Sequence, residues 1–350
     1  MTETHDFYRL PDDEQARRLT LLAESATQHW EGGFDDVRLV KYRENAVFSA
    51  TRADGTRVAI RVHRYGYHSD AALQSELHWM RHIGLTGAVQ VPDVIPTATG
   101  ELVAYVAHDA VPEHRHVSIL GWLLGEPVGT SEAGVETCGD AARRLYFDAG
   151  VIAANLHDLS STMPLFDGFT RHSWDEDGLV GEQPLWGRFW ENADLTAEAR
   201  ALLAAARAAS REDLRRFGKD DANYGLIHAD LVPENLLNDG GALKLIDFDD
   251  AGYGWYLFEL ATALYFNLGE SQYAAIEESL IRGYRTVREL PESHRELLPL
   301  FLFLRGTTYL GWIGSRPETE TAKSLGPMLT ERVCSLATAY LNSRGATVGI

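Results

Sequence analysis

Residues 224–255 read YGLIHADLVPENLLNDGGALKLIDFDDAGYGW, and three polar positions in this stretch decide the fold. Asp230 follows His228 by two residues, Asn235 follows Asp230 by five, and Asp247 stands between Ile246 and Phe248. An aspartate, an asparagine and a second aspartate at this spacing, the last one flanked by apolar residues, indicate a site built from oxygen ligands.

The segment between Asn235 and Asp247 predicts a β-hairpin. Two short apolar runs, residues 236–237 and 242–246, flank the turn sequence Asn-Asp-Gly-Gly at 238–241. Because a hairpin brings its ends together, we expect Asn235 and Asp247 to meet beside Asp230. Phosphoryl transfer needs oxygen ligands for Mg²⁺ and a carboxylate that orients the attacking hydroxyl. The grouping therefore predicts Asn235 and Asp247 as metal ligands and Asp230 as the catalytic base.

This stretch resembles the catalytic and metal-binding segments of the aminoglycoside phosphotransferase superfamily, within the protein-kinase-like fold. It is especially similar to the branch that holds type II homoserine kinases and bacterial stress-response Ser/Thr kinases. Over residues 35–345, the resemblance implies an α+β, two-lobed fold with a β-rich N-lobe and a mostly helical C-lobe. It also implies ATP and Mg²⁺ as cofactors.

The order of predicted elements agrees with two lobes, because strands come first and helices later. Apolar spacing predicts a helix in residues 12–30, strands between 36 and 62 with a turn at Asp54-Gly55, and a helix over 69–83 capped by Ser69. Further strands are expected at 101–107 and 115–123, and from about residue 139 only helices apart from the hairpin. We expect a helical extension at 1–35, the N-lobe at 36–120, a hinge at 121–127 and the C-lobe at 128–350.

A kinase-like N-lobe needs a strand cation for the ATP phosphates and a glutamate on the next helix that braces it. Arg61 occupies the strand position where the family pattern has lysine, and Glu76 falls on the following helix. Strand alternation puts Ala59 on the face of Arg61, toward the adenine. The turn at 42–48 lacks a glycine-rich motif, and Asn45 is the candidate phosphate donor there. The alternatives are a surface arginine, a solvated helix glutamate and an ordinary turn.

Residues 164–191 are the least helix-like part of the second lobe and contain three of the eight tryptophans. An aromatic, charged and glycine-punctuated segment suits a lid over the acceptor hydroxyl. Its candidate substrate-binding residues are Arg171, His172, Trp174 and Asp175. The alternative is that the tryptophans only pin a long loop to the core. Asp249 and Asp250 would favour an amine-bearing substrate, unless they form a solvated acidic rim.

The charge balance excludes polyanionic partners. The chain has 51 acidic and 32 basic residues and a net charge of −19, whereas nucleic acids and anionic membranes are bound through Lys and Arg. Cys138 and Cys334 stand far apart, outside any metal-ligand spacing, as expected for reduced thiols. The first residues contain no apolar signal core. We therefore expect a cytoplasmic protein that binds neither nucleic acid nor membrane.

The leading hypothesis is an ATP- and Mg²⁺-dependent kinase that phosphorylates a small-molecule hydroxyl, on an amino alcohol, an amino sugar or a hydroxy amino acid such as homoserine. The alternative from the same resemblance is a Ser/Thr protein kinase of the stress-response type. A third hypothesis is a catalytically inactive nucleotide-binding module, motivated by arginine at position 61. Only eleven residues separate Asp247 from Glu259, too few for the activation segment of a regulated protein kinase, which favours the first hypothesis. Glu259 itself is expected to brace the backbone of the catalytic loop.

Overall fold

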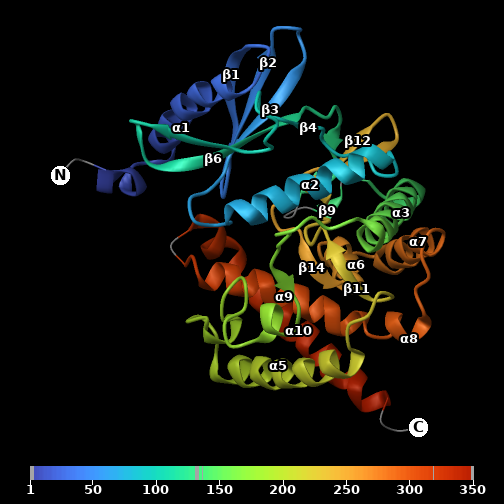
Figure 1. Ribbon diagram of the computed structural model, residues 1–350. Helices are drawn as coiled ribbons and strands as arrows, with labels where there is room; N and C mark the ends of the chain where they lie inside the picture. The colour runs from blue at the N-terminus through green and yellow to red at the C-terminus, as the bar shows by residue number, and fades with distance from the viewer. Residues whose placement is uncertain (1–3, 131–133, 136, 318, 348–350) are drawn as a thin grey trace. The chain divides into compact units, whose positions relative to one another are not determined.

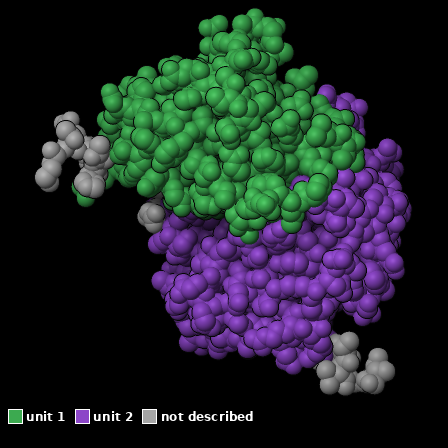
Figure 2. Space-filling view, viewed as in Figure 1, with its two compact units in different colours: residues 1–125, 164–171, 244–246 green, residues 126–163, 172–243, 247–350 purple. Residues whose placement is uncertain are grey.

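The computed structural model describes residues 4–130, 134–135, 137–317 and 319–347. The chain divides into two compact units (Figure 2). Unit 1 comprises residues 1–125, 164–171 and 244–246, and unit 2 comprises residues 126–163, 172–243 and 247–350. Unit 1 carries the larger sheet and unit 2 most of the helices, so the predicted α+β class of the kinase-like fold is confirmed.

Unit 1 is built on a six-stranded antiparallel sheet in the order β1-β2-β3-β6-β4, with β5 paired to β6 (Figure 1). Its helices, with η for 3₁₀, and its strands are η1 (Thr4–Arg9), α1 (Asp12–Ala26), η2 (Thr27–His29), β1 (Phe34–Tyr42), β2 (Ala46–Arg52), β3 (Arg57–Val62), α2 (Asp70–Thr86), β4 (Val94–Ile95), β5 (Ala104–His108) and β6 (Val111–Gly121).

The helix predicted in residues 12–30 is present as α1, which ends at Ala26 and is followed by η2. Apolar side chains of this segment enter the core of unit 1. Leu19, Leu22 and Trp30 lie in one buried cluster with Phe48 and Ile60 of the sheet. The indole Nε1 of Trp30 also donates to the carbonyl of Ile95, at 2.8 Å. The segment expected as an N-terminal extension thus covers a face of the sheet that would otherwise expose its apolar side chains.

The local signals that the sequence offers for α2 and for the turn before β3 are confirmed. The Ser69 hydroxyl accepts a hydrogen bond from the N–H of Ala72, as an N-cap does. Gly87 ends the helix in the left-handed conformation, with φ 68°. Gly55 has φ 84° in the turn that joins β2 to β3. These turns and caps fix the start of β3, which carries Arg61, and the two ends of α2, which carries Glu76.

Unit 2 is mostly helical and includes short strands. Its elements are β7 (Glu126–Pro127), β8 (Gly129–Thr130), β9 (Gly134–Val135), α3 (Gly139–Thr162), β10 (Ser173–Trp174), α4 (Glu176–Val180), η3 (Phe189–Glu191), α5 (Ala197–Phe217), β11 (Tyr224–Ile227), η4 (Pro233–Asn235), β12 (Leu236–Asp239), β13 (Ala242–Leu245), β14 (Gly252–Trp255), α6 (Tyr256–Tyr265), α7 (Tyr273–Arg285), α8 (Glu292–Arg295), α9 (Leu298–Gly314) and α10 (Glu320–Thr347). The last residues of β13 count with unit 1.

The predicted hairpin is confirmed as β12 and β13, but the expectation of helices alone elsewhere after residue 139 was wrong. A further sheet has the order β10-β14-β11, and the loop that contains Asp230 follows β11. Its strands are two to four residues long, too short to show a period-2 pattern. Among the described residues, no helix combines the length and the apolarity that crossing a membrane requires.

Candidate active site

The loop after β11 is held by a buried glutamate. The carboxylate of Glu259, on α6, accepts hydrogen bonds from the N–H groups of His228 (2.8 Å) and Ala229 (2.7 Å). Glu259 is fully buried; burial raises its pKa to about 7, against the lowering effect of the two backbone bonds. Ala229 has φ 63°, a strained conformation for alanine. The expectation that Glu259 braces this backbone is confirmed. Because Asp230 follows Ala229 directly, these hydrogen bonds also fix the main chain at Asp230.

Asp230 is held from two sides. Its Oδ1 accepts from Nη2 of Arg305 at 2.8 Å, and its Oδ2 accepts from Nδ2 of Asn235 at 2.7 Å. The same amide nitrogen donates to the main-chain carbonyl of Asp230 at 2.9 Å. The side chain stays 22% exposed, so an acceptor can still reach the carboxylate. Asp230 is thereby fixed in one orientation without being sealed off.

The pKa of Asp230 is raised to about 6, chiefly by burial. The negative charges of Asp247 and Glu234 raise it further, and the Arg305 guanidinium opposes them. A carboxyl group with a pKa near 6 is ionised at neutral pH and is a stronger base than an ordinary aspartate.

Asp247 follows the hairpin directly. Asn238 closes the turn by accepting from the N–H of Gly241 at 2.9 Å. Asp247 then adopts φ 66°, a second strained position beside the site. The next side chain, Phe248, is fully buried, and its ring meets the imidazole of His228 edge-on at 4.6 Å between centroids. Phe248 therefore ties the segment that carries Asp247 to the loop that carries Asp230.

The donor set of this loop and hairpin fits Mg²⁺. Asp247 offers carboxylate oxygens, and Asn235 uses its amide nitrogen as a donor, which leaves the amide oxygen for a cation. Within the described residues, no group of three or more His, Cys, Asp or Glu side chains could hold a metal ion. Mg²⁺ is commonly bound by one or two carboxylates together with substrate phosphates.

Arg305 is the residue that the sequence analysis missed. It is fully buried on α9, and besides Asp230 it donates to the carbonyl of Ala229 at 3.1 Å and to the hydroxyl of Tyr309. Its guanidinium lies 4.4 Å from the ring centre of Tyr309 and 5.4 Å from that of Trp186. The available signal was a single arginine within the apolar run 297–313, because a buried guanidinium needs a counter-charge.

The substrate candidates of unit 2 separate into two places. His172 Nε2 and Trp174 Nε1 both lie within hydrogen-bonding distance of the carbonyl of Asp250, at 3.0 and 2.8 Å. Burial raises the pKa of Asp250 well above its usual value, with the charges of Asp230 and Asp249 adding to the effect. Asp175 lies apart from them: its carboxylate caps α4 and pairs with Lys219 at 2.9 Å.

Unit 1 holds the remaining candidates. Arg61 Nη2 lies 2.6 Å from Glu76 Oε1, and the two side chains are 6% and 0% exposed. Ala59 is partly buried, two residues before Arg61 on β3. The side-chain oxygen of Asn45 accepts from the N–H of Arg64 at 3.0 Å, which joins the β1–β2 turn to the loop after β3. Arg171 also lies in unit 1, with Nη1 3.3 Å from Glu76 Oε2.

Comparisons with known proteins point to one family. The sequence profile of a family described as the phosphotransferase enzyme family matches residues 37–290. The amicoumacin kinase of Bacillus subtilis (strain 168) is 28% identical over 321 residues, covering 87% of this chain and 86% of the relative. A homoserine kinase of Chelativorans sp. (strain BNC1) is 38% identical over 156 residues, covering 43% of this chain and 45% of the relative.

Solved structures agree with the sequence comparison. The structure of a microcompartment-associated aminopropanol kinase is 32% identical, with a TM-score of 0.80 over 93% of this chain and 98% of that one. An amicoumacin kinase in complex with AMP-PNP, Ca²⁺ and its ligand has a TM-score of 0.74 at 18% identity, over 93% and 96% of the two chains, and shares the fold.

Proposed function

The chain belongs to the phosphotransferase enzyme family, and on that premise we propose that it transfers the γ-phosphoryl group of ATP, with Mg²⁺, to a hydroxyl group of a small amine-bearing alcohol. Family membership makes the protein a kinase. The observation that carries the finer proposal is the fixed, partly exposed Asp230 carboxylate between Arg305 and Asn235.

Each residue of the loop and hairpin has a separate task in this proposal. Asp230 accepts the proton of the acceptor hydroxyl, whose oxygen then attacks the γ-phosphorus. Asp247 and the amide oxygen of Asn235 hold Mg²⁺, which when bound neutralises charge on the phosphates. Glu76 braces Arg61, which serves the α and β phosphates in place of the family's lysine. Positioning and charge neutralisation then supply most of the rate enhancement.

The acidic residues near Asp230 support an amine on the acceptor. The negative charges of Asp230, Asp249 and Asp247 all raise the pKa of Asp250, so these four carboxyl groups repel one another when ionised. An ammonium group compensates such charge, whereas an acceptor with a carboxylate in that position is repelled. Aminopropanol and homoserine, named for two of the similar kinases, each have an amine and a hydroxyl group.

The test is a screen of ATP consumption over pairs of alcohols that differ only in the amine, such as 1-amino-2-propanol against 2-propanol. We expect turnover with at least one amino alcohol and a kcat/KM at least about tenfold lower for its amine-free partner. Equal turnover of an amino alcohol and its amine-free counterpart would contradict the proposal that the acceptor has an amine. Label from ATP on the protein itself or on casein, with no small-molecule product, would instead support the Ser/Thr protein kinase.

The role of Asp230 is tested separately by Asp230→Asn. We expect kcat to fall by about 10²- to 10⁴-fold, because the amide cannot accept the hydroxyl proton. Nucleotide affinity, measured by calorimetry with a non-hydrolysable ATP analogue, should change by no more than about twofold, since the substitution removes a group that acts in the transition state. Retained turnover in a folded variant rejects the role of Asp230 as base.

A further inference from the structure

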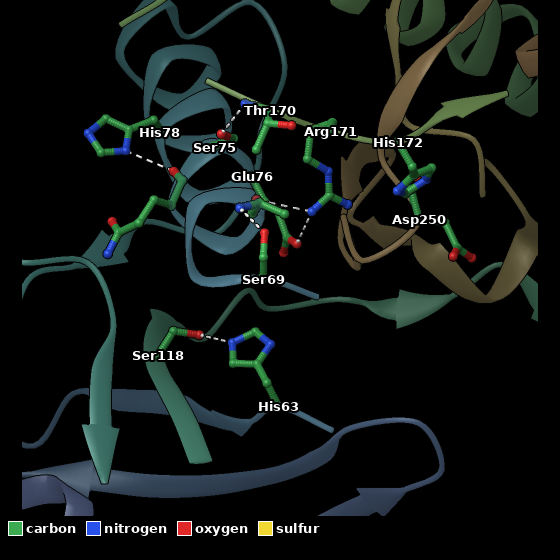
Figure 3. A network of polar contacts seen from close by, with 12 residues as sticks. His63, Ser69, Ser75, Glu76, His78, Ser118, Thr170, Arg171, His172 and Asp250 are labelled. Carbon is green, nitrogen blue, oxygen red and sulfur yellow. Dashed lines mark hydrogen bonds and ion pairs between the residues drawn. The ribbon is translucent and has the colours of Figure 1, made fainter. Parts of the chain in front are cut away.

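Glu76 is shared by two arginines from distant parts of the chain. Its Oε1 pairs with Arg61 at 2.6 Å, and its Oε2 pairs with Arg171 at 3.3 Å. The side chains of Arg61, Glu76 and Arg171 are 6%, 0% and 1% exposed. Figure 3 shows Arg171 directed at Glu76 from the chain segment beside α2. One carboxylate thus serves two guanidinium groups in a site shielded from water.

Arg171 reaches Glu76 from a segment that is itself fastened to α2. The N–H of Thr170 donates to the hydroxyl of Ser75 at 2.9 Å, and Arg171 Nη1 donates to the carbonyl of Ala72 at 3.1 Å (Figure 3). Farther back, the ring of Phe166 lies 4.6 Å from that of His78. Residues 164–171 accordingly belong to unit 1. Besides its bond to Glu76, the guanidinium is thus held by a main-chain carbonyl of α2.

Two arginines on one carboxylate have a physical consequence. Each Glu76 oxygen has its own donor, so the carboxylate is fixed in one plane and Arg61 is held in one rotamer. Arg61 stands at the family's phosphate-binding position, and a guanidinium held in one rotamer there can meet phosphate oxygens in a defined geometry.

We propose that Arg171 is a positioning residue of the nucleotide side, which orients Glu76 and through it the guanidinium of Arg61 toward the ATP phosphates. The inference rests on the proposed function and assigns Arg171 to the nucleotide in place of the acceptor. His172, the next residue, belongs to unit 2 and contacts the carbonyl of Asp250. Within residues 164–191, the part that serves the nucleotide therefore ends at Arg171. The part on the acceptor side begins at His172.

The test compares Arg171→Gln with Arg207→Gln. Arg207 is a control for the nucleotide side, because it also binds main-chain carbonyls (Val180 and Gly181) and a glutamate (Glu182), none of which belongs to the cluster around Glu76. We expect Arg171→Gln to raise the Kd of a non-hydrolysable ATP analogue and the KM for ATP by about tenfold, as for loss of a charged hydrogen bond. The acceptor KM should stay within about twofold, and Arg171→Lys should recover part of the loss.

A second comparison separates positioning from general damage. In Glu76→Gln, the further change Arg171→Gln should cost much less than in the wild type, because its partner is already altered. Ser75→Ala, which removes the hydroxyl that anchors Thr170 and that also donates to the carbonyl of Ala71, should weaken nucleotide binding slightly, and it replaces Arg171→Gln should that variant not fold. An unchanged ATP affinity in a folded Arg171→Gln, an effect confined to the acceptor KM, or additive losses overturn the inference. Absence of ATP binding in the wild type overturns the proposed function as well.

Discussion

At the scale of single residues, the most informative side chain is Arg305. Its planar guanidinium group donates hydrogen bonds to the carbonyl of Ala229, the carboxylate of Asp230 and the hydroxyl of Tyr309. A lysine can supply the charge but not three bonds at fixed angles. Arg305 therefore fixes the orientation of the proposed base and keeps its negative charge compensated in a buried environment.

We expect Arg305→Lys to lower kcat by at least about tenfold and Arg305→Met by at least about a hundredfold, because misplacement of a catalytic group by about 1 Å has effects of that size. The KM for ATP should change little. Steady-state kinetics with the best acceptor measure both. Tyr309→Phe is the control, since it keeps the ring and removes only the hydroxyl partner of Arg305. Full activity in Arg305→Met would show that Asp230 is oriented by other contacts.

His157 gives a prediction about stability and pH. The residue is fully buried on α3, its Nδ1 lies 2.9 Å from the hydroxyl of Tyr284, and its ring stacks on Tyr256. Burial, and secondarily the charge of Arg288, hold its pKa well below the usual value. His157 therefore stays neutral in the folded protein at pH values where it is protonated in the unfolded chain. Because the folded pKa is depressed, the contribution of neutral His157 to the free energy of unfolding is present above the unfolded pKa and is lost as the pH falls.

Between about pH 7.5 and about pH 5.5, the wild type should therefore lose about 1.4 kcal/mol more unfolding free energy than His157→Phe. The phenylalanine keeps the stack on Tyr256 and removes the titrating group. Urea unfolding of both proteins at the two pH values measures the difference, in which the other histidines cancel. A constant gap between the two proteins at both pH values would contradict the proposed burial of neutral His157.

At the scale of elements, α3 and α7 meet backbone to backbone. A Cβ on Gly283 would lie 1.9 Å from the carbonyl oxygen of Phe147, and one on Gly150 would lie 2.1 Å from that of Leu280. Real carbon atoms do not approach so closely, so any side chain at either position forces the helices apart. This contact fixes the position of α3, which also packs against β11 and the helix carrying Glu259.

We predict that Gly283→Ala destabilises unit 2 by about 1–3 kcal/mol or more through overpacking. Gly84→Ala is the control, because it lies in α2 with its nearest outside atom at 3.7 Å, and there alanine should stabilise the helix by up to about 1 kcal/mol. Thermal unfolding followed by circular dichroism measures both changes. Equal melting temperatures for the two variants would mean that α3 and α7 can separate at no cost.

Elements with a complete local signal could be predicted, and those that depend on distant partners could not. The hairpin β12–β13 has its turn sequence, and α2 has its serine cap, so both follow from the order of residues. The strands β10 and β14 pair in parallel across some eighty residues of sequence, and each is too short to show alternation. Arg305 was missed because its partners lie about seventy-five residues away.

At the scale of the whole molecule, the sequence predicts the division into a β-rich and a helical part, since strand patterns precede helical ones. It does not predict that residues 164–171 and 244–246 belong to unit 1. Their membership depends on long-range contacts, such as those of Arg171 with Ala72 and Glu76, which leave no periodic trace in the sequence. Because of these contacts, we propose that Arg171 serves the nucleotide and not the acceptor.

That membership governs how relatives of this enzyme can be recombined. A chimaera with a single crossover at Gly125 would inherit Glu76 from one parent and residue 171 from the other. The contact between these two positions would then combine side chains from two different proteins. A swap that carries residues 164–171 and 244–246 along with the first 125 keeps each parental core whole. Libraries that exchange acceptor preference between such kinases should therefore be cut at four further junctions, on either side of these two short segments.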